Sequence, residues 1–132
     1  AGQLSQVEHL LENLDPEIRS QVIQSWSNLS NQDRATTWLL PADTNIPQWI
    51  KGDHPKVAVR VSNHPLCIAL CNAFNGFIVS TSANPAGLEA ARSIQDVNQY
   101  FGHELNYLNG DLGQSSEPSK IIDASTGEVI RP

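Results

Sequence analysis

The sequence of 132 residues has no methionine, only two cysteines and no apolar run that approaches a membrane span. A transmembrane helix needs about 18–20 consecutive apolar residues. The chain also does not open with the basic and apolar regions of a secretory signal. Two cysteines, Cys67 and Cys71, are too few for a disulfide scaffold. We therefore expect a globular protein of the cytoplasm, without membrane contact and with both thiols reduced.

Positive charge is also scarce, since the chain has 8 Lys and Arg but 14 Asp and Glu, and its net charge is −6. A protein that grips nucleic acid mainly through phosphates usually has the opposite balance. A local basic groove remains compatible with this count. The sequence also lacks both common glycine-rich nucleotide loops and the Gly-x-Ser-x-Gly elbow of many hydrolases. Any nucleotide site must therefore be built in another way.

Helical and strand patterns alternate along the chain, which predicts an α/β sheet. We find no internal repeat and no linker, so we expect one domain over residues 1–132. Apolar spacing and capping residues predict helices over residues 4–14, 16–26, 65–75 and 94–101, with Gly76 as the cap of the third. Short apolar segments predict strands over residues 36–40, 57–61, 77–79, 105–108, 120–123 and 129–131. Residues 42–56 are expected to form an irregular excursion held to the body by Ile46, Trp49 and Ile50.

Small polar side chains follow the predicted strand 77–79. Residues 80–84 (Ser-Thr-Ser-Ala-Asn) offer hydroxyl and amide groups and exposed backbone N–H groups, which suit phosphate or carboxylate oxygens. They are equally compatible with a turn that satisfies only its own backbone. Ligands of open α/β sheets bind beyond the carboxyl ends of strands, so we expect a ligand-binding loop there.

Three further features carry candidate chemistry. Arg60 lies inside the predicted strand 57–61, where a guanidinium needs a carboxylate from the protein or from a ligand. Ser119, Lys120 and Arg131 bring donors to the last two strands, although alone they resemble solvated edge residues. His64, Cys67 and Cys71 share a helical face, but a fourth zinc ligand is missing, so buried thiols are the favoured interpretation.

Four segments in order resemble motifs of the YrdC-type threonylcarbamoyl-AMP synthases, a family that serves tRNA modification. They are the arginine-containing strand and helix start at 57–65, the Ser-x-Ser-Ala-Asn signature at 80–84 continued by Pro-Ala-Gly, the Pro-Ser-x-Ile-Ile-Asp strand at 118–123 and the closing Ile-Arg-Pro at 130–132. The resemblance covers residues 36–132 and continues more weakly to Ala1. It implies a YrdC-like twisted mixed sheet flanked by helices.

The resemblance implies an L-threonylcarbamoyladenylate synthase, a nucleotidyltransferase that joins threonine, bicarbonate and ATP and releases pyrophosphate. Mg²⁺ is expected with ATP, and no protein nucleophile or protein-held metal is expected. A tRNA threonylcarbamoyl transferase would act downstream, with tRNA or double-stranded RNA as a further partner class. The implied threonine contacts are Arg60, Ser80 and Ser119, and the implied nucleotide contacts are Thr37, Ser82, Asn84 and Arg131. Asn84 would either hold the loop's shape or reach the ligand.

The sequence departs from the family pattern in two places. Members usually carry Pro-Gly-Pro before the strand of Thr37, where this chain has Asp33-Arg34-Ala35-Thr36. Members also begin with a region that bears a Lys-x-Arg motif, and no stretch of this chain substitutes for it. We therefore expect the C-terminal two-thirds of the domain, incomplete at the N-terminus and inactive alone.

Two other functions are compatible with the resemblance. The first is an RNA-binding or ribosome-maturation module, which would need a concave basic surface. The second is carbamoyl transfer in metal-cofactor maturation, since larger multidomain enzymes contain YrdC-like domains. The Arg131-Pro132 ending, where stand-alone members tend to finish, argues against the second.

Overall fold

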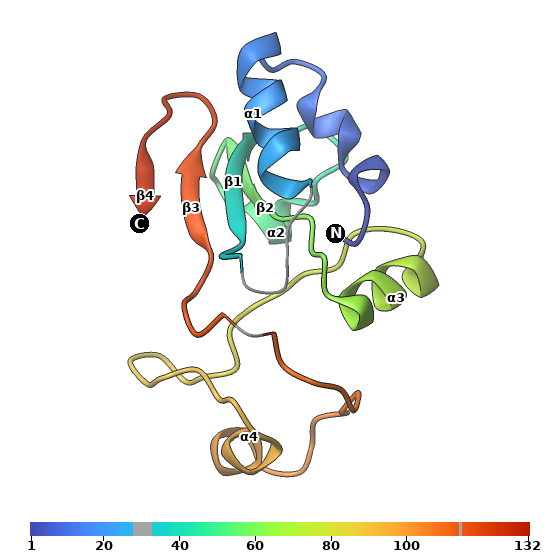
Figure 1. The fold of residues 1–132 in the computed structure, drawn as a ribbon, viewed down its shortest axis with the longest axis vertical. Coiled ribbons are helices and arrows are strands. Elements are labelled where there is room, and N and C mark those ends of the chain that lie inside the picture. Colours follow the sequence, from blue (N-terminus) through green and yellow to red (C-terminus); the bar gives the residue numbers. More distant parts are fainter. Residues whose placement is uncertain (28–32, 114) are drawn as a thin grey trace. The chain divides into compact units, whose positions relative to one another are not determined.

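A computed structural model describes residues 1–27, 33–113 and 115–132. They form two compact units (Figure 1): the sheet unit, Ala1–Ile78 with Gly113–Pro132, and the loop unit, Val79–Leu112. The single domain expected from the sequence stays a prediction. Within the described ranges, no helix combines the length and apolarity needed to cross a membrane.

The sheet unit contains a mixed four-stranded sheet with the order β2-β1-β3-β4. Its strands are β1 (Thr36–Pro41), β2 (Lys56–Val59), β3 (Lys120–Asp123) and β4 (Val129–Arg131). The central strand β1 runs parallel to β3 and antiparallel to β2, while β4 runs antiparallel to β3 at the edge. The α/β fold class and the antiparallel edge strand predicted from the sequence are confirmed.

Helix α1 (Pro16–Trp26) contributes Val22 and Trp26 to the core of the sheet unit. The helix begins where Asp15 accepts a hydrogen bond from the Glu17 N–H at 2.9 Å, with a proline at its first position. Proline is suited to this position because its missing N–H would be unsatisfied there anyway. The indole N–H of Trp26 donates to the Thr36 carbonyl at 2.9 Å, which joins the helix to the start of β1. The helix predicted over residues 16–26 is confirmed.

The segment before α1 is not the single α-helix that the sequence predicted. It forms two 3₁₀ helices, η1 (Leu4–Gln6) and η2 (Glu8–Leu11). In a 3₁₀ helix, side chains three residues apart lie over one another. The spacing of three among Leu4, Val7 and Leu10 suits that geometry as well as it suits an α-helix, and Val7 and Leu10 enter the core.

The excursion at residues 42–56 contains a short helix, α2 (Gln48–Lys51). Ile46 is buried and Ile50 packs against the core, as predicted. Trp49 was predicted to help hold the excursion, but its side chain is 77% exposed. Within one turn of helix, neighbouring residues point in different directions, so Ile50 and Trp49 cannot both face the core.

Helix α3 (Pro65–Phe74) begins at His64, whose Nδ1 accepts the Leu66 N–H at 3.2 Å. The helix ends at Asn75, which has a left-handed φ of 58°, and not at the predicted Gly76. Asparagine tolerates this conformation because its short polar side chain can hydrogen-bond locally. Both cysteines on α3 are free thiols, with Cys71 buried and Cys67 half-buried.

Gly2 lies against α3 with no room for a side chain. A β-carbon added there would stand 2.8 Å from the Ile68 Cα and 3.1 Å from the Cys71 Cβ. Because the first contact is with helix backbone, we expect Gly2→Ala to lower the free energy of unfolding by about 1–3 kcal/mol. Urea unfolding measures the change. Gly113→Ala is the matched control, since nothing lies within 4 Å of its added β-carbon, and equal stability of the two variants would contradict the prediction.

The loop unit contains helix α4 (Ile94–Phe101). Ser93 caps it by accepting the Asp96 N–H at 3.0 Å, and Gly102 ends it with a φ of 67°, as predicted. The pKa of the Asp96 carboxyl is lowered, mainly by its hydrogen bond with Ser93.

The strands predicted at 77–79 and 105–108 are absent from the described structure. A strand persists only where a neighbouring strand satisfies its backbone groups, and the sheet contains only β1 to β4 among the described residues.

Candidate active site

One end of the sheet gathers the candidate residues of the sheet unit. Because β1 and β3 are parallel and their neighbours are antiparallel, the starts of β1 and β3 lie beside the ends of β2 and β4. The sequence analysis expected ligands at the carboxyl ends of strands. Thr37 and Ser119 lie instead at the amino ends of β1 and β3, and where ligands bind stays a prediction.

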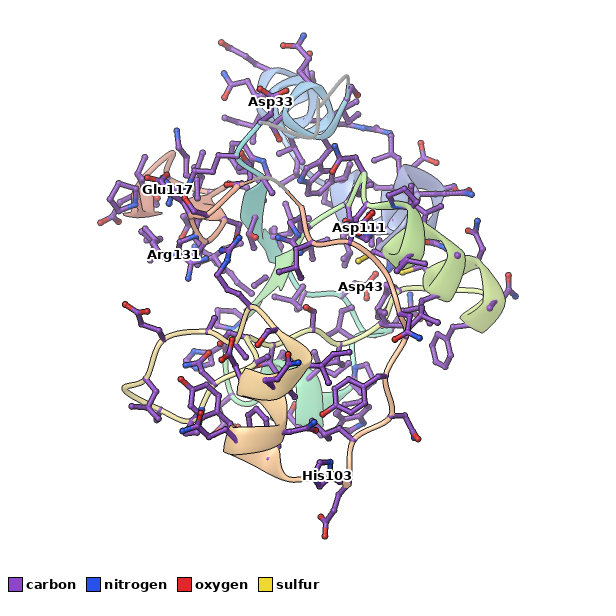
Figure 2. The ribbon with its side chains drawn as sticks, turned by 60° about the horizontal axis from the view of Figure 1, so that its bottom comes forward. Asp33, Asp43, His103, Asp111, Glu117 and Arg131 are labelled. Carbon is purple, nitrogen blue, oxygen red and sulfur yellow. The ribbon has the colours of Figure 1, made fainter. Side chains whose placement is uncertain are left out.

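Three predicted site residues form a hydrogen-bonded cluster at this end, which we call the Ser119 cluster: Thr37, Ser119 and Arg131. The Thr37 and Ser119 hydroxyls are 2.8 Å apart. Arg131 donates through Nη2 to the Ser119 hydroxyl at 3.0 Å and through Nε to the Ser119 carbonyl at 2.8 Å. Thr37 and Ser119 are half-buried and Arg131 is exposed, so the cluster can receive a ligand from solvent. Figure 2 labels Arg131, the last residue of β4.

Arg60 directly follows β2, which ends at Val59 and not at the predicted Val61. Trp38 of β1 pairs with Val59 of β2. Because the two strands are antiparallel, the next pair in this register is Thr37 with Arg60. Arg60 is half-buried, and its guanidinium has no hydrogen bond or ion pair with any described residue. The sequence left open whether Arg60 pairs with a carboxylate of the protein or of a ligand. Among the described residues, no protein carboxylate pairs with it.

The serine loop, residues 80–84, belongs to the loop unit. Asn84 holds its shape, because the side-chain N–H₂ donates to the Pro85 carbonyl at 3.1 Å and to the Leu88 carbonyl at 2.9 Å. The hydroxyls of Ser80 and Ser82 are exposed and make no hydrogen bond within the described part of the chain. The Asn84 amide therefore serves the turn, and ligand binding by the Ser80 and Ser82 hydroxyls stays a prediction.

Arg34 is a residue of this region that the sequence analysis missed. Its Nε donates to the Pro118 carbonyl at 2.8 Å and its Nη2 to the Pro132 carbonyl at 2.6 Å, while Nη1 lies 3.0 Å from the Glu117 carboxylate. Glu117 is labelled in Figure 2. The only trace in the sequence was the replacement of Pro-Gly-Pro by a segment that contains this arginine.

The described residues contain no group of three or more His, Cys, Asp or Glu side chains that could hold a metal ion. His64 uses Nδ1 to cap α3, which leaves the three-residue zinc candidate with even fewer donors. Mg²⁺ that accompanies ATP stays a prediction. An open hollow of about 640 Å³, lined by residues including Asp43 and Lys51, contains none of the predicted site residues. Thr37, Ser119 and Arg131 of the predicted site lie at the Ser119 cluster and not in this hollow.

The fold and the site define a class: an α/β protein with a mixed sheet, whose guanidinium and hydroxyl groups suit anionic oxygen ligands. The Sua5/YciO/YrdC family model, described as telomere recombination, matches residues 2–132. A threonylcarbamoyl-AMP synthase of Acinetobacter baumannii (strain AYE) is 67% identical over 132 residues, which are 100% of this chain and 70% of the relative. The synthase of Cellvibrio japonicus is 41% identical over 133 residues, covering 100% of this chain and 67% of that protein.

A solved structure of a double variant of P. abyssi Sua5 has the same fold, with a TM-score of 0.83 at 23% identity over 99% of this chain and 39% of that chain. This chain belongs to the Sua5/YciO/YrdC family.

Proposed function

We propose that the protein is an L-threonylcarbamoyladenylate synthase that acts in tRNA modification. Its curated relatives at 67% and 65% identity carry the name threonylcarbamoyl-AMP synthase. In the reaction, the threonine amine and bicarbonate form a carbamate and water. A carbamate oxygen then attacks the α-phosphate of ATP, and pyrophosphate leaves. Every participant except water is an anion or carries a carboxylate or phosphate, so the site must supply positive charge and hydrogen-bond donors.

The observation that carries this proposal is the half-buried Arg60 at the sheet end that holds the Ser119 cluster, with a guanidinium that has no partner among the described residues. A guanidinium without a protein partner is suited to a bidentate carboxylate ligand, and the threonine carboxylate is such a ligand. Ser119 and Ser80 would contribute hydroxyls to threonine. Thr37, Ser82 and Arg131 would contact the nucleotide, and Asn84 would act by keeping the serine loop in shape.

Catalysis would then depend on positioning and electrostatic stabilisation and not on a protein nucleophile. Arg60 binds the carboxylate and so presents the threonine amine to bicarbonate. The Ser119 hydroxyl, fixed between Thr37 and Arg131, orients polar groups of the substrates. ATP is the co-substrate, and Mg²⁺ bound to its phosphates would neutralise part of their charge.

The reaction can be tested on the intact protein that carries this chain. With threonine, bicarbonate, ATP and Mg²⁺, we expect pyrophosphate release and a product with the mass of threonylcarbamoyl-AMP. Omission of either threonine or bicarbonate should abolish both signals. Pyrophosphate release that persists without threonine would contradict the proposed substrate, and absence of product under all conditions would contradict the reaction.

The proposed product passes to a tRNA threonylcarbamoyl transferase in the cytoplasm. Direct RNA binding is a separate function, and the net charge of −6 does not favour it. If RNA binding occurs, phosphate contacts would make it steeply salt-dependent. Titration of tRNA and of double-stranded RNA at low and physiological salt measures this.

A further inference from the structure

Three backbone carbonyls beside the Ser119 cluster are bound by arginine side chains. Ser119 accepts from Arg131 Nε, while Pro118 and Pro132 accept from Arg34. Residues 118 and 119 precede β3 and residue 132 follows β4, so all three carbonyls lie outside the assigned strands. The two prolines have no N–H to offer. Their carbonyls are therefore the only backbone groups by which they can be held.

We propose that Arg34 is a positioning residue for the candidate site, a role that rests on the proposed function. Arg34 holds the residue before Ser119 and the residue after Arg131 with one guanidinium. Any movement of either proline would shift the positions of the Ser119 hydroxyl and the Arg131 side chain together. Arg34 thereby fixes the distance between the group expected at threonine and the group expected at the nucleotide.

The geometry favours a positioning role over direct ligand binding. Three different guanidinium nitrogens of Arg34 already have protein partners, two carbonyls and the Glu117 carboxylate. The carboxylate offsets the positive charge that a phosphate would otherwise meet. The rigid planar fork is what allows one side chain to reach three oxygens at once, which a lysine ammonium on a flexible stem does not reproduce.

The test compares Arg34→Ala, Arg34→Lys, Glu117→Gln and Arg19→Ala in the intact protein, with KM and kcat measured for threonine and for ATP. Arg34→Ala should raise both KM values about tenfold while kcat changes much less, because the substrates are bound in a looser site. Arg34→Lys should resemble Arg34→Ala. Glu117→Gln keeps both carbonyl contacts and should stay within about twofold of the parent.

Arg19→Ala is the matched arginine control. Arg19 pairs with Glu8 at 3.6 Å on the surface of the sheet unit, and its removal should leave KM unchanged. Full recovery of KM by Arg34→Lys would overturn the proposal, because charge alone would then suffice. A fall in apparent kcat that matches the loss of folded protein, with both KM values unchanged, would overturn it too, since it would indicate only a structural role.

A second readout separates this proposal from the proposed function. Amide hydrogen exchange of residues 119–121 and 129–131 should increase about tenfold in Arg34→Ala and not in Arg19→Ala. If the parent protein makes no threonylcarbamoyl-AMP, the proposed function fails while this exchange result still reports whether Arg34 holds the two segments. Unchanged exchange in Arg34→Ala would overturn the positioning role, whatever the activity.

Discussion

Replacement of Arg60 by alanine is expected to weaken threonine binding by about 10- to 100-fold. The range corresponds to the loss of charged hydrogen bonds worth about 1.5–3 kcal/mol. The guanidinium has no hydrogen bond or ion pair with a described residue, so its removal should cost the fold little. Isothermal titration calorimetry of the intact protein with threonine, in the presence of ATP and Mg²⁺, measures the affinity. Thermal unfolding checks that the variant is folded.

Two controls sharpen the Arg60 experiment. Arg60→Lys keeps the charge but loses the bidentate fork, so its affinity should fall between those of the parent and of Arg60→Ala. Arg19→Ala removes an arginine whose partner is Glu8 and should bind threonine as the parent does. If the threonine affinity of Arg60→Ala equals that of the parent, Arg60 does not bind the threonine carboxylate.

Replacement of Asp123 is expected to have a large effect on stability. Its carboxylate is buried, lies 2.5 Å from the Lys56 Nζ and accepts the Ser125 N–H at 2.8 Å. The contact joins the start of β2 to the end of β3 across β1. Asp123→Ala would leave the half-buried ammonium of Lys56 without its partner. We expect the free energy of unfolding to fall by about 2–4 kcal/mol at neutral pH, measured by urea unfolding.

The effect of Asp123 should depend on pH. The hydrogen bond from Lys56 lowers the pKa of the Asp123 carboxyl and outweighs the opposing effect of burial. A carboxyl with a lower pKa in the folded state binds fewer protons there, so it stabilises the fold above its unfolded pKa of about 3.9. This stabilisation is lost as the pH falls through the folded-state pKa. The stability difference between the parent and Asp123→Asn should therefore shrink as the pH is lowered below about 4.

Asp53→Asn is the matched control for the pH series. Asp53 is exposed and accepts a hydrogen bond from Gln48 at 3.1 Å, so its replacement should change stability by less than about 0.5 kcal/mol. Lys56→Met removes the main cause of the lowered pKa and should destabilise the fold at neutral pH in the same direction. A pH-independent difference for Asp123→Asn would show that packing, and not the ion pair, carries the effect.

Sequence reasoning succeeded where the structure depends on neighbouring residues. Helix α1 begins at an Asp-Pro pair, and α4 lies between Ser93 and Gly102, each of which satisfies helix-end groups locally. Strands β1 and β3 were found from short apolar or β-branched segments that end at identifiable residues. The 3₁₀ helices at residues 4–11 were missed because a spacing of three or four suits either helix type.

Other failed predictions concern contacts between distant segments. Residues 77–79 have a strand-like composition, but a strand requires hydrogen-bonding neighbours that composition does not specify. The sequence analysis did not single out Arg34, because its partners Pro118 and Pro132 lie 84 and 98 residues away along the chain. The roles of Ser80 and Ser82 stay predictions.

The sequence by itself determined the family and the candidate groups, because motif residues and their order are properties of the chain. Only the tertiary structure decided which of these groups meet. The parallel pairing of β1 with β3 brings Thr37 to Ser119, although they lie 82 residues apart. The end of β4 brings Arg131 to the same hydroxyl. Hydrogen bonds between distant strands set these distances, and no local pattern of residues encodes a partner so far along the chain.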